Sequence, residues 1–446
     1  MIASRDIIAA IATASGVAGV AIVRLSGPHC IDLAMGAFRP AHDAAIAPRI
    51  MTYGRFIDAD GRAFDDGYLV HFPGPASFTG EDVVELHTHG GRAAPATALA
   101  RLRELGARMA EPGEFTRRAL ESGRIDLAQA EAILDVVHAR SEASLRAASA
   151  RLAGALSGRL RDLRERLVSA KALVEAQIDF EDADVGDVET AAIATLVESA
   201  RRDLAALADG YTRSRIYREG ALAVIAGRPN VGKSSLLNAL VGRRRALVSE
   251  EPGTTRDAIE DDVVLADVPF RLVDTAGLRR EAERLEAQGI EITRERIAEA
   301  DLVVFVIDAF AGETDEDRAL RATLPPVPVV AVANKCDLAA LPGVLNVSAT
   351  VGTGLDTLAA EMARAALGEA VSGNDEALLA SERHQQRTLA AIAHLDAALA
   401  TLAAGASPAI TALEIADAAR ALGEIVGETT PDDVLGAIFS RFCIGK

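Results

Sequence analysis

A glycine-rich segment at residues 227–234, GRPNVGKS, has the residue types and spacing of a loop that binds phosphate. It follows an apolar run typical of a buried strand and precedes a helical pattern, which is the context that this chemistry requires. Glycines let backbone N–H groups turn toward phosphate oxygens, Lys233 neutralises their charge, and the Ser234 hydroxyl can bind Mg²⁺. The residues expected to contact a nucleotide here are Asn230, Val231, Gly232, Lys233, Ser234 and Ser235.

The segment NKCD at residues 334–337 indicates that the nucleotide base is guanine. Guanine presents an N1–H and an amino group on one edge, and the Asp337 carboxylate can accept hydrogen bonds from both. Adenine offers no such pair, so the ATP complex would leave a carboxylate unpaired and would be weaker. Ser348 and Ala349 follow a short apolar run and would close over the base. We therefore expect GTP contacts from Asn334, Lys335, Asp337, Ser348 and Ala349.

Two further segments have the composition of nucleotide switches. In DTAG at residues 274–277, Asp274 can hold Mg²⁺ through water and Gly277 can sense a γ-phosphate. In PGTTRD at residues 252–257, Thr255 is the best candidate to complete the Mg²⁺ shell. The expected contacts here are Thr254, Thr255, Asp274, Thr275, Ala276 and Gly277. The order of these segments resembles that of the translation-factor-related GTPases.

Leu278 occupies the position where many GTPases have a glutamine that orients the attacking water. An apolar side chain cannot align a nucleophile, so catalysis must be completed in another way. Two devices are available: a carboxylate farther along the switch, and a monovalent cation that neutralises transition-state charge.

Changes in sequence pattern along the chain predict its domains. Residues 1–118 mix short apolar runs with turns, as in a compact α/β domain. Residues 119–217 and 373–446 have the apolar spacing of long amphipathic helices. Residues 218–372 alternate apolar runs with helix-sized stretches, which predicts a parallel, doubly wound sheet. We therefore expect a nucleotide-binding α/β domain inserted into a helical domain.

The composition is that of a globular protein with a strong acidic excess. The chain has 446 residues, enough for about three domains, with 47 basic and 65 acidic side chains and a net charge of −18. This charge opposes nonspecific contact with nucleic acid, so any such contact must use a local basic patch or a partner. Three widely spaced cysteines fit a reducing cytoplasm, and the uncharged stretch 7–23 is interrupted by Thr, Ser and Gly, which disfavours a membrane role.

Segments along the whole chain, in the same order, resemble the tRNA wobble-uridine modification GTPases known as MnmE or TrmE. They are FPGPASFTGEDVVELHTHGG (72–91), PGEFTRRAL (112–120), DLAQAEAI (126–133), GRPNVGKSSLLNAL (227–240), PGTTRD, DTAGLR and the final FCIGK (442–446). The resemblance implies an N-terminal α/β domain for folate binding and dimerisation, a helical domain, and an inserted Ras-like phosphate-loop domain.

The resemblance also implies a potassium ion at the nucleotide. Its ligands carry over to Asn230, Ser249, Glu251 and Thr254, and Ser249 also counts among the GTP contacts. The catalytic acid of the family, counted from DTAG, falls on Glu286, with Lys233 as the other catalytic residue. Solvent-exposed helix charges are the alternative interpretation of Glu286 and its neighbour Glu283.

For the N-terminal domain, the resemblance implies a tetrahydrofolate derivative, either 5-formyl- or 5,10-methylene-tetrahydrofolate. Its ligands map onto Arg24, Glu81, Arg124 and the C-terminal Lys446, where Arg124 replaces the lysine expected there. Cys443, close to that lysine, is either a nucleophile or redox group or a thiol that packs under a helix end.

The function that follows is a cytoplasmic, potassium-dependent GTP hydrolase. The resemblance implies that, with an FAD-dependent partner subunit in a heterotetramer, a homodimer of this chain adds a (carboxymethyl)aminomethyl group at C5 of the wobble uridine of tRNA. The alternative is a regulatory GTPase, such as a ribosome-maturation switch, which shares the nucleotide segments but performs no chemistry on RNA. The N-terminal segments and the FCIGK tail favour the first interpretation.

Overall fold

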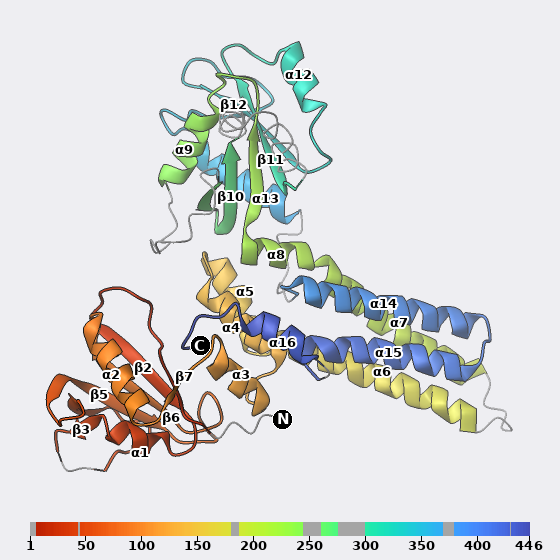
Figure 1. Ribbon diagram of the computed structural model, residues 1–446. Helices are drawn as coiled ribbons and strands as arrows, with labels where there is room; N and C mark the ends of the chain where they lie inside the picture. The colour runs from red at the N-terminus through yellow and green to blue at the C-terminus, as the bar shows by residue number, and fades with distance from the viewer. Residues whose placement is uncertain are drawn as a thin grey trace, which may run out of the picture. The chain divides into compact units, whose positions relative to one another are not determined.

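The computed structural model describes residues 6–42, 45–179, 187–243, 260–274, 299–368, 379–428 and 430–446. It divides into two compact units, each described here by itself (Figure 1). One unit comprises Met1–Leu134 together with Gly423–Lys446, and the other comprises Asp135–Leu422. The first unit therefore joins the two ends of the chain.

Within its described residues, the first unit contains a seven-stranded sheet in the order β3-β4-β5-β6-β2-β1-β7. Its strands are β1 (Ile8–Ile11), β2 (Val20–Ser26), β3 (Phe38–Pro40), β4 (Thr52–Ile57), β5 (Ala63–Phe72), β6 (Val83–His89) and β7 (Arg108–Met109). Neighbours pair antiparallel except β1 and β7. The helices of this part are α1 (Cys30–Met35), α2 (Ala93–Glu104), α3 (Glu114–Glu121), α4 (Leu127–Val137) and α16 (Asp432–Phe439).

Along β2, side chains point alternately into the core of this sheet and toward a polar face. Val23 and Leu25 are fully buried, together with Leu86 of β6. Because successive side chains of a strand point to opposite faces, Arg24 lies on the other face, where it pairs in register with Glu85. The same pairing that builds the core thus places a cation beside a carboxylate.

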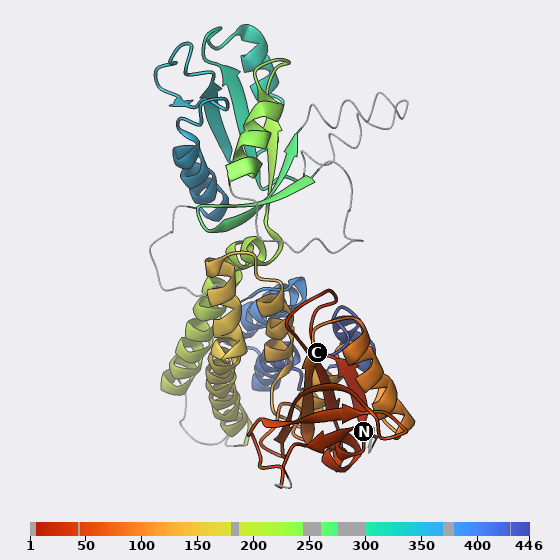
Figure 2. The ribbon, with the colours of Figure 1, turned by 90° about the vertical axis from the view of Figure 1, so that its left-hand side faces the viewer.

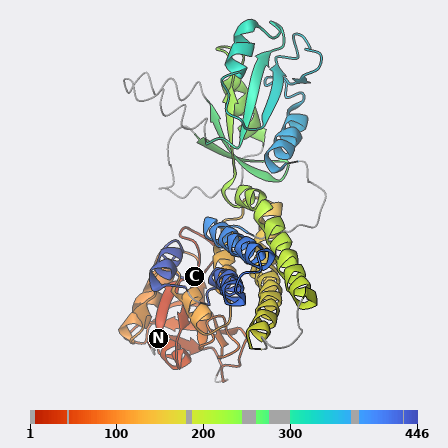
Figure 3. The same cartoon turned by 90° about the vertical axis from the view of Figure 1, so that its right-hand side faces the viewer.

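The helical part of the second unit consists of long amphipathic helices. They are α5 (Glu142–Leu152), α6 (Ala155–Asp179), α7 (Asp187–Asp209), α8 (Tyr211–Glu219), α14 (Glu382–Ala403) and α15 (Pro408–Val426). Along α6, leucines at 156, 160, 163 and 167 are fully buried, which is the spacing of a single helix face. α7 packs against both α6 and α14 (Figure 3). In the described residues, no helix has both the length and the apolar character needed to cross a membrane.

Between α8 and α14 lies a domain built on a second sheet, which has six strands among the described residues, in the order β13-β12-β11-β8-β10-β9. The strands are β8 (Ala221–Ala226), β9 (Glu260–Leu265), β10 (Val268–Asp274), β11 (Leu302–Asp308), β12 (Val329–Asn334) and β13 (Leu345–Asn346), with helices α9 (Lys233–Arg243), α12 (Asp315–Arg321) and α13 (Leu355–Leu367). All neighbours are parallel except β9 and β10 (Figure 2).

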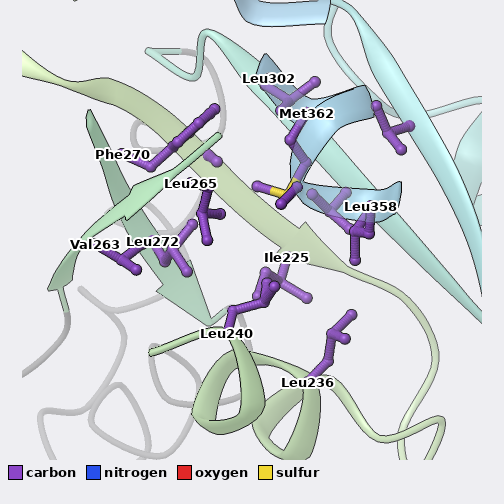
Figure 4. Close-up of a cluster of buried hydrophobic side chains, with 14 of the residues drawn as sticks. Ile225, Leu236, Leu240, Val263, Leu265, Phe270, Leu272, Leu302, Leu358 and Met362 are labelled. Atoms are coloured by element: carbon purple, nitrogen blue, oxygen red, sulfur yellow. The ribbon is translucent and has the colours of Figure 1, made fainter. Parts of the chain in front are cut away.

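Helices cover both faces of this sheet, which confirms the doubly wound prediction. On one face, Leu236 and Leu240 of α9 and Leu358 and Met362 of α13 pack against strand residues such as Ile225 (Figure 4). On the other face, Leu320 of α12 packs against the cluster that includes Val303 and Phe305. The apolar runs read from the sequence are buried because helices cover them from both sides.

Candidate functional site

The phosphate loop follows β8 and ends where α9 begins at Lys233. Gly227, with a φ of +149°, lies so close to β11 that a Cβ atom there would be 2.4 Å from the carbonyl oxygen of Val306. Lys233 is 7% exposed, and its ammonium donates hydrogen bonds to the carbonyl oxygens of Gly227 (2.9 Å) and Arg228 (2.8 Å). The lysine is therefore held over the loop at the N-terminus of α9, where an anion is favoured.

Two oxygen ligands meet beside this loop. The Ser234 hydroxyl, in the first turn of α9, donates a hydrogen bond to the Asp274 carboxylate at the end of β10. Asp274 is buried, with 8% exposure. Hydroxyl and carboxylate oxygens are the ligands that Mg²⁺ prefers, directly or through water, so the residues present fit this ion.

Asn334 connects the phosphate loop to the segment expected over the base. Its side chain is buried, and its amide donates to the carbonyl oxygen of Val231 (3.0 Å). Its own side-chain oxygen accepts from the backbone N–H of Ala349 (3.1 Å). A Cβ atom on Gly232 would lie 2.2 Å from this amide nitrogen, so glycine is required there.

Asp337 and Ser348, both expected at the base, lie side by side. The Ser348 hydroxyl donates to Oδ1 of Asp337 at 2.5 Å. In turn, the Ser348 oxygen accepts from the backbone N–H of Val351 (3.2 Å). One oxygen of the carboxylate is thereby fixed in place before any base arrives, which reduces the conformational cost of binding.

A second polar site lies in the first unit, around Arg24. The guanidinium forms hydrogen bonds of 3.0 and 2.8 Å with Glu85 and contacts the carbonyl oxygen of Gly445 at 3.5 Å. It also lies 5.9 Å from the ring centre of Phe78 and 5.8 Å from that of Phe115.

A hydrogen bond between Glu85 and His87 contributes most to a lowered pKa of Glu85. Burial of the carboxyl opposes this shift, and Arg24 reinforces it. Glu85 is therefore ionised near neutral pH, and Arg24 has a charged partner.

Glu81 is held by a buried ionic network. Its Oε2 accepts from Arg118 (2.9 Å) and from the Ser26 hydroxyl (2.9 Å), while no hydrogen bond from the described residues reaches Oε1. Arg118 is 5% exposed and also binds Glu114, which is 1% exposed, at 3.0 Å. Burial favours the neutral form of Glu114, but Arg108 and Arg118 hold its pKa below the ordinary value. Arg118, itself held by Glu114, thus fixes Glu81 together with the Ser26 hydroxyl.

The remaining two residues expected at this site belong to the same neighbourhood. A Cβ atom on Gly80 would lie 3.5 Å from Cγ of Arg124, so Arg124 adjoins the loop that carries Glu81. Lys446 follows Gly445, whose carbonyl oxygen contacts Arg24. The tail is held by a bridge between Ile444 and Pro112. Arg24, Glu81 and Arg124 therefore lie at one loop, residues 72–81, and the C-terminal tail reaches Arg24 through Gly445.

Comparison with known proteins identifies the family. The family model described as the MnmE helical domain matches residues 127–443, and that described as the GTP-binding protein TrmE N-terminus matches residues 7–124. The tRNA modification GTPase MnmE of Heliobacterium modesticaldum is 42% identical over 99% of both chains, and that of Geobacter sulfurreducens is 41% identical, also over 99% of both. The chain belongs to the MnmE family. Its enzyme class is that of the GTP hydrolases.

Among solved structures, the G domain of FeoB from Methanococcus jannaschii matches 33% of this chain and 98% of its own, with 25% identity and a TM-score of 0.25.

Several predicted residues of the MnmE-type site lie outside the described residues. These are Ser249, Glu251, Thr254, Thr255, Thr275, Ala276, Gly277 and Glu286. Cys443 is described and is exposed. Cys30, by contrast, is buried, and burial together with Asp82 and Glu81 raises the pKa of its thiol to about 12, so it remains protonated.

Sequence reasoning missed three charged residues that hold these sites. Arg118 supports Glu81, and no local spacing connects them. Asp317 is fully buried and accepts from Arg228 of the phosphate loop (2.7 Å) while capping α12 with Thr314. The Thr-x-x-Asp spacing of this cap could have been recognised in the sequence as the start of a helix. The third residue is Asp308, at the end of β11.

Proposed function

We propose that this chain hydrolyses GTP as part of a reaction that modifies tRNA. The specific reaction proposed is addition of a (carboxymethyl)aminomethyl group at C5 of the wobble uridine, with a tetrahydrofolate derivative as one-carbon donor and an FAD-dependent partner. The observation that carries the proposal is that one chain holds both a guanine-nucleotide site and a separate polar site completed by its own C-terminal residues. The relatives that match its full length are named tRNA modification GTPases.

At the nucleotide, each residue has a physical task. Lys233 neutralises phosphate charge from a position that the loop carbonyls already fix. Ser234 and Asp274 would hold Mg²⁺, which supplies further neutralisation of phosphate charge when bound. Because Leu278 cannot orient a water molecule, we assign that role to Glu286. Thr254, Thr255 and Thr275 to Gly277 would complete the contacts to the γ-phosphate and metal.

The proposal includes a potassium ion bound by Asn230, Ser249, Glu251 and Thr254. Asn230 is the described member of this set and lies in the phosphate loop itself, with a φ of +66°. A monovalent cation there would supply the positive charge that an arginine provides in other GTPases, and would neutralise negative charge on the phosphates in the transition state.

GTP turnover should be at least about tenfold faster in K⁺ than in Na⁺ at equal ionic strength, because such a cation would stabilise the charge of the transition state. Phosphate release measures this, and light scattering with a γ-phosphate mimic follows dimerisation. A slow rate that is the same in both salts would contradict the potassium site and favour the regulatory GTPase.

For the folate derivative, the residues present fit the ligand class. Arg24, Arg124 and Lys446 provide cations for glutamyl carboxylates, and the Glu81 carboxylate provides an acceptor for ring N–H groups. The exposed ring of Phe78 adds an apolar surface beside Arg24.

Glu81→Gln should weaken binding of 5-formyl-tetrahydrofolate by at least about tenfold, since a charged acceptor held by two donors becomes neutral. Isothermal titration calorimetry of the full chain measures this. Glu111→Gln is the matched control, because Glu111 is an exposed carboxylate of the same unit that pairs only weakly with Arg117 (3.4 Å). Equal affinity of the Glu81 variant and the wild type would contradict the assignment.

The proposed assembly is a cytoplasmic homodimer that joins the FAD-dependent subunit in a heterotetramer. Three free cysteines are consistent with a reducing compartment. A net charge of −18 supports a partner or a local basic patch for the tRNA contact. Cys443, exposed beside the C-terminal residues at the polar site, is proposed as a nucleophile or redox group. The domain limits 1–118, 119–217, 218–372 and 373–446 belong to the same proposal.

A further inference from the structure

Asp308 ends β11 and uses its two carboxylate oxygens for different tasks. Oδ1 accepts hydrogen bonds from the backbone N–H groups of Phe310 (2.9 Å) and Ala311 (3.4 Å), which fixes the turn after the strand. Oδ2 accepts from the ammonium of Lys335 at 2.5 Å. Lys335 follows β12, the neighbour of β11 in the sheet (Figure 1). Asp308 therefore joins the turn of its own strand to the guanine segment NKCD.

Lys335 continues this connection into the phosphate loop. Its ammonium also donates to the carbonyl oxygen of Asn230 at 3.0 Å. Both residues have left-handed backbones, with φ of +68° at Lys335 and +66° at Asn230. This conformation is unfavourable for residues other than glycine, and they keep it only where surrounding contacts hold them. One lysine side chain thus links two strained segments that must bind the same nucleotide.

The charge of Asp308 determines where this lysine points. A lysine side chain has many rotamers, and the Lys335 side chain is 34% exposed here, so solvent competes for its ammonium. The Asp308 side chain is 17% exposed. Although burial opposes its ionisation, Lys335 and the two backbone N–H groups hold its pKa below the ordinary value. An ionised partner at this distance keeps the ammonium within reach of the phosphate loop.

We propose that Asp308 is a positioning residue for nucleotide binding: through Lys335, it pre-organises the phosphate loop at Asn230. The role needs neither the potassium ion nor the folate site, and it applies to GTP and GDP alike. Preformed loops bind more tightly because less conformational entropy is lost on binding.

Asp308→Asn separates the two tasks of the side chain. The amide oxygen can still accept from Phe310 and Ala311, so the turn is kept, whereas the charge that holds Lys335 is lost. In the full-length protein with Mg²⁺, the Kd for GDP should rise about tenfold, the loss typical of one charge-assisted hydrogen bond. Calorimetric titration measures this, and the thermal unfolding midpoint without nucleotide reports separately any loss of fold stability from the missing charge. An unchanged Kd would overturn the proposal.

A double-mutant cycle with Lys335→Ala tests whether Asp308 acts through that lysine. If it does, Asp308→Asn should not raise the Kd for GDP any further once Lys335 is alanine, since the group that Asp308 positions is gone. If the losses of GDP affinity in the two single variants add up in the double variant, the proposal is overturned, because Asp308 would then act by another route. Asp315→Asn is the matched control: this carboxylate is 97% exposed, pairs with Arg318 and lies in the same domain, so the variant should bind GDP like the wild type.

Discussion

Lys233→Ala should lower the rate of GTP hydrolysis by at least about a thousandfold, because it removes the buried cation that neutralises charge on the β- and γ-phosphates. The carbonyl oxygens of Gly227 and Arg228 already fix the ammonium at the mouth of the loop. Nothing else in the described loop has a charge that could take its place, since Arg228 is engaged by Asp317. Single-turnover phosphate release at saturating GTP gives the rate.

Lys171→Ala is the control for this experiment. Lys171 is a lysine of α6 with 37% exposure, and it pairs with Glu175 one turn away. Removing Lys171 changes the net charge by the same amount as removing Lys233. It should leave turnover within about twofold of the wild type, because surface ion pairs contribute little to stability. If Lys233→Ala also retained normal turnover, the phosphate-loop assignment would be wrong.

The sheet of the nucleotide domain could be predicted because its strands are buried on both faces. A strand covered twice must be apolar throughout, so ALAVIA of β8 and LVVFVID of β11 stand out as continuous runs. The sheet of the first unit gives a weaker signal. Its strand β7 has only two residues, both exposed, and owes its position to pairing with β1 about a hundred residues earlier.

The proximity of the phosphate loop, Asp274 and Asn334 could also be predicted, since each lies at the carboxyl end of a parallel strand. Such ends meet at one edge of the sheet, so Asp274 and Asn334 had to approach the loop after β8. From the residues alone, the polar site of the first unit could not be located in this way. Arg24 and Gly445 lie 421 positions apart, and the Arg118 network that supports Glu81 crosses from α3 to the loop before β6. Only tertiary folding brings these groups together.

Asp337→Asn should reverse the base preference. Guanine offers two N–H donors to the carboxylate, and an amide presents one acceptor and one donor, so one pair becomes donor against donor. We expect the affinity for GTP to fall at least about a hundredfold, the combined effect of one lost charge-assisted bond and one unpaired donor. In xanthine, a carbonyl replaces the amino group, and that carbonyl can accept from the new amide. Affinity for XTP should therefore rise as affinity for GTP falls.

The contact between Ser348 and Asp337 makes this reversal a sharp test of the guanine site. Because the Ser348 hydroxyl donates to Oδ1 and already accepts from the Val351 N–H, it favours the oxygen of the substituted amide at that position, with the NH₂ group at the other. The variant therefore presents one defined pattern to the base. Competition of GTP and XTP for a fluorescent GDP analogue measures both affinities in one preparation. A gain in affinity for XTP shows that the variant is folded, whereas an unchanged preference for GTP would mean that Asp337 does not contact the base.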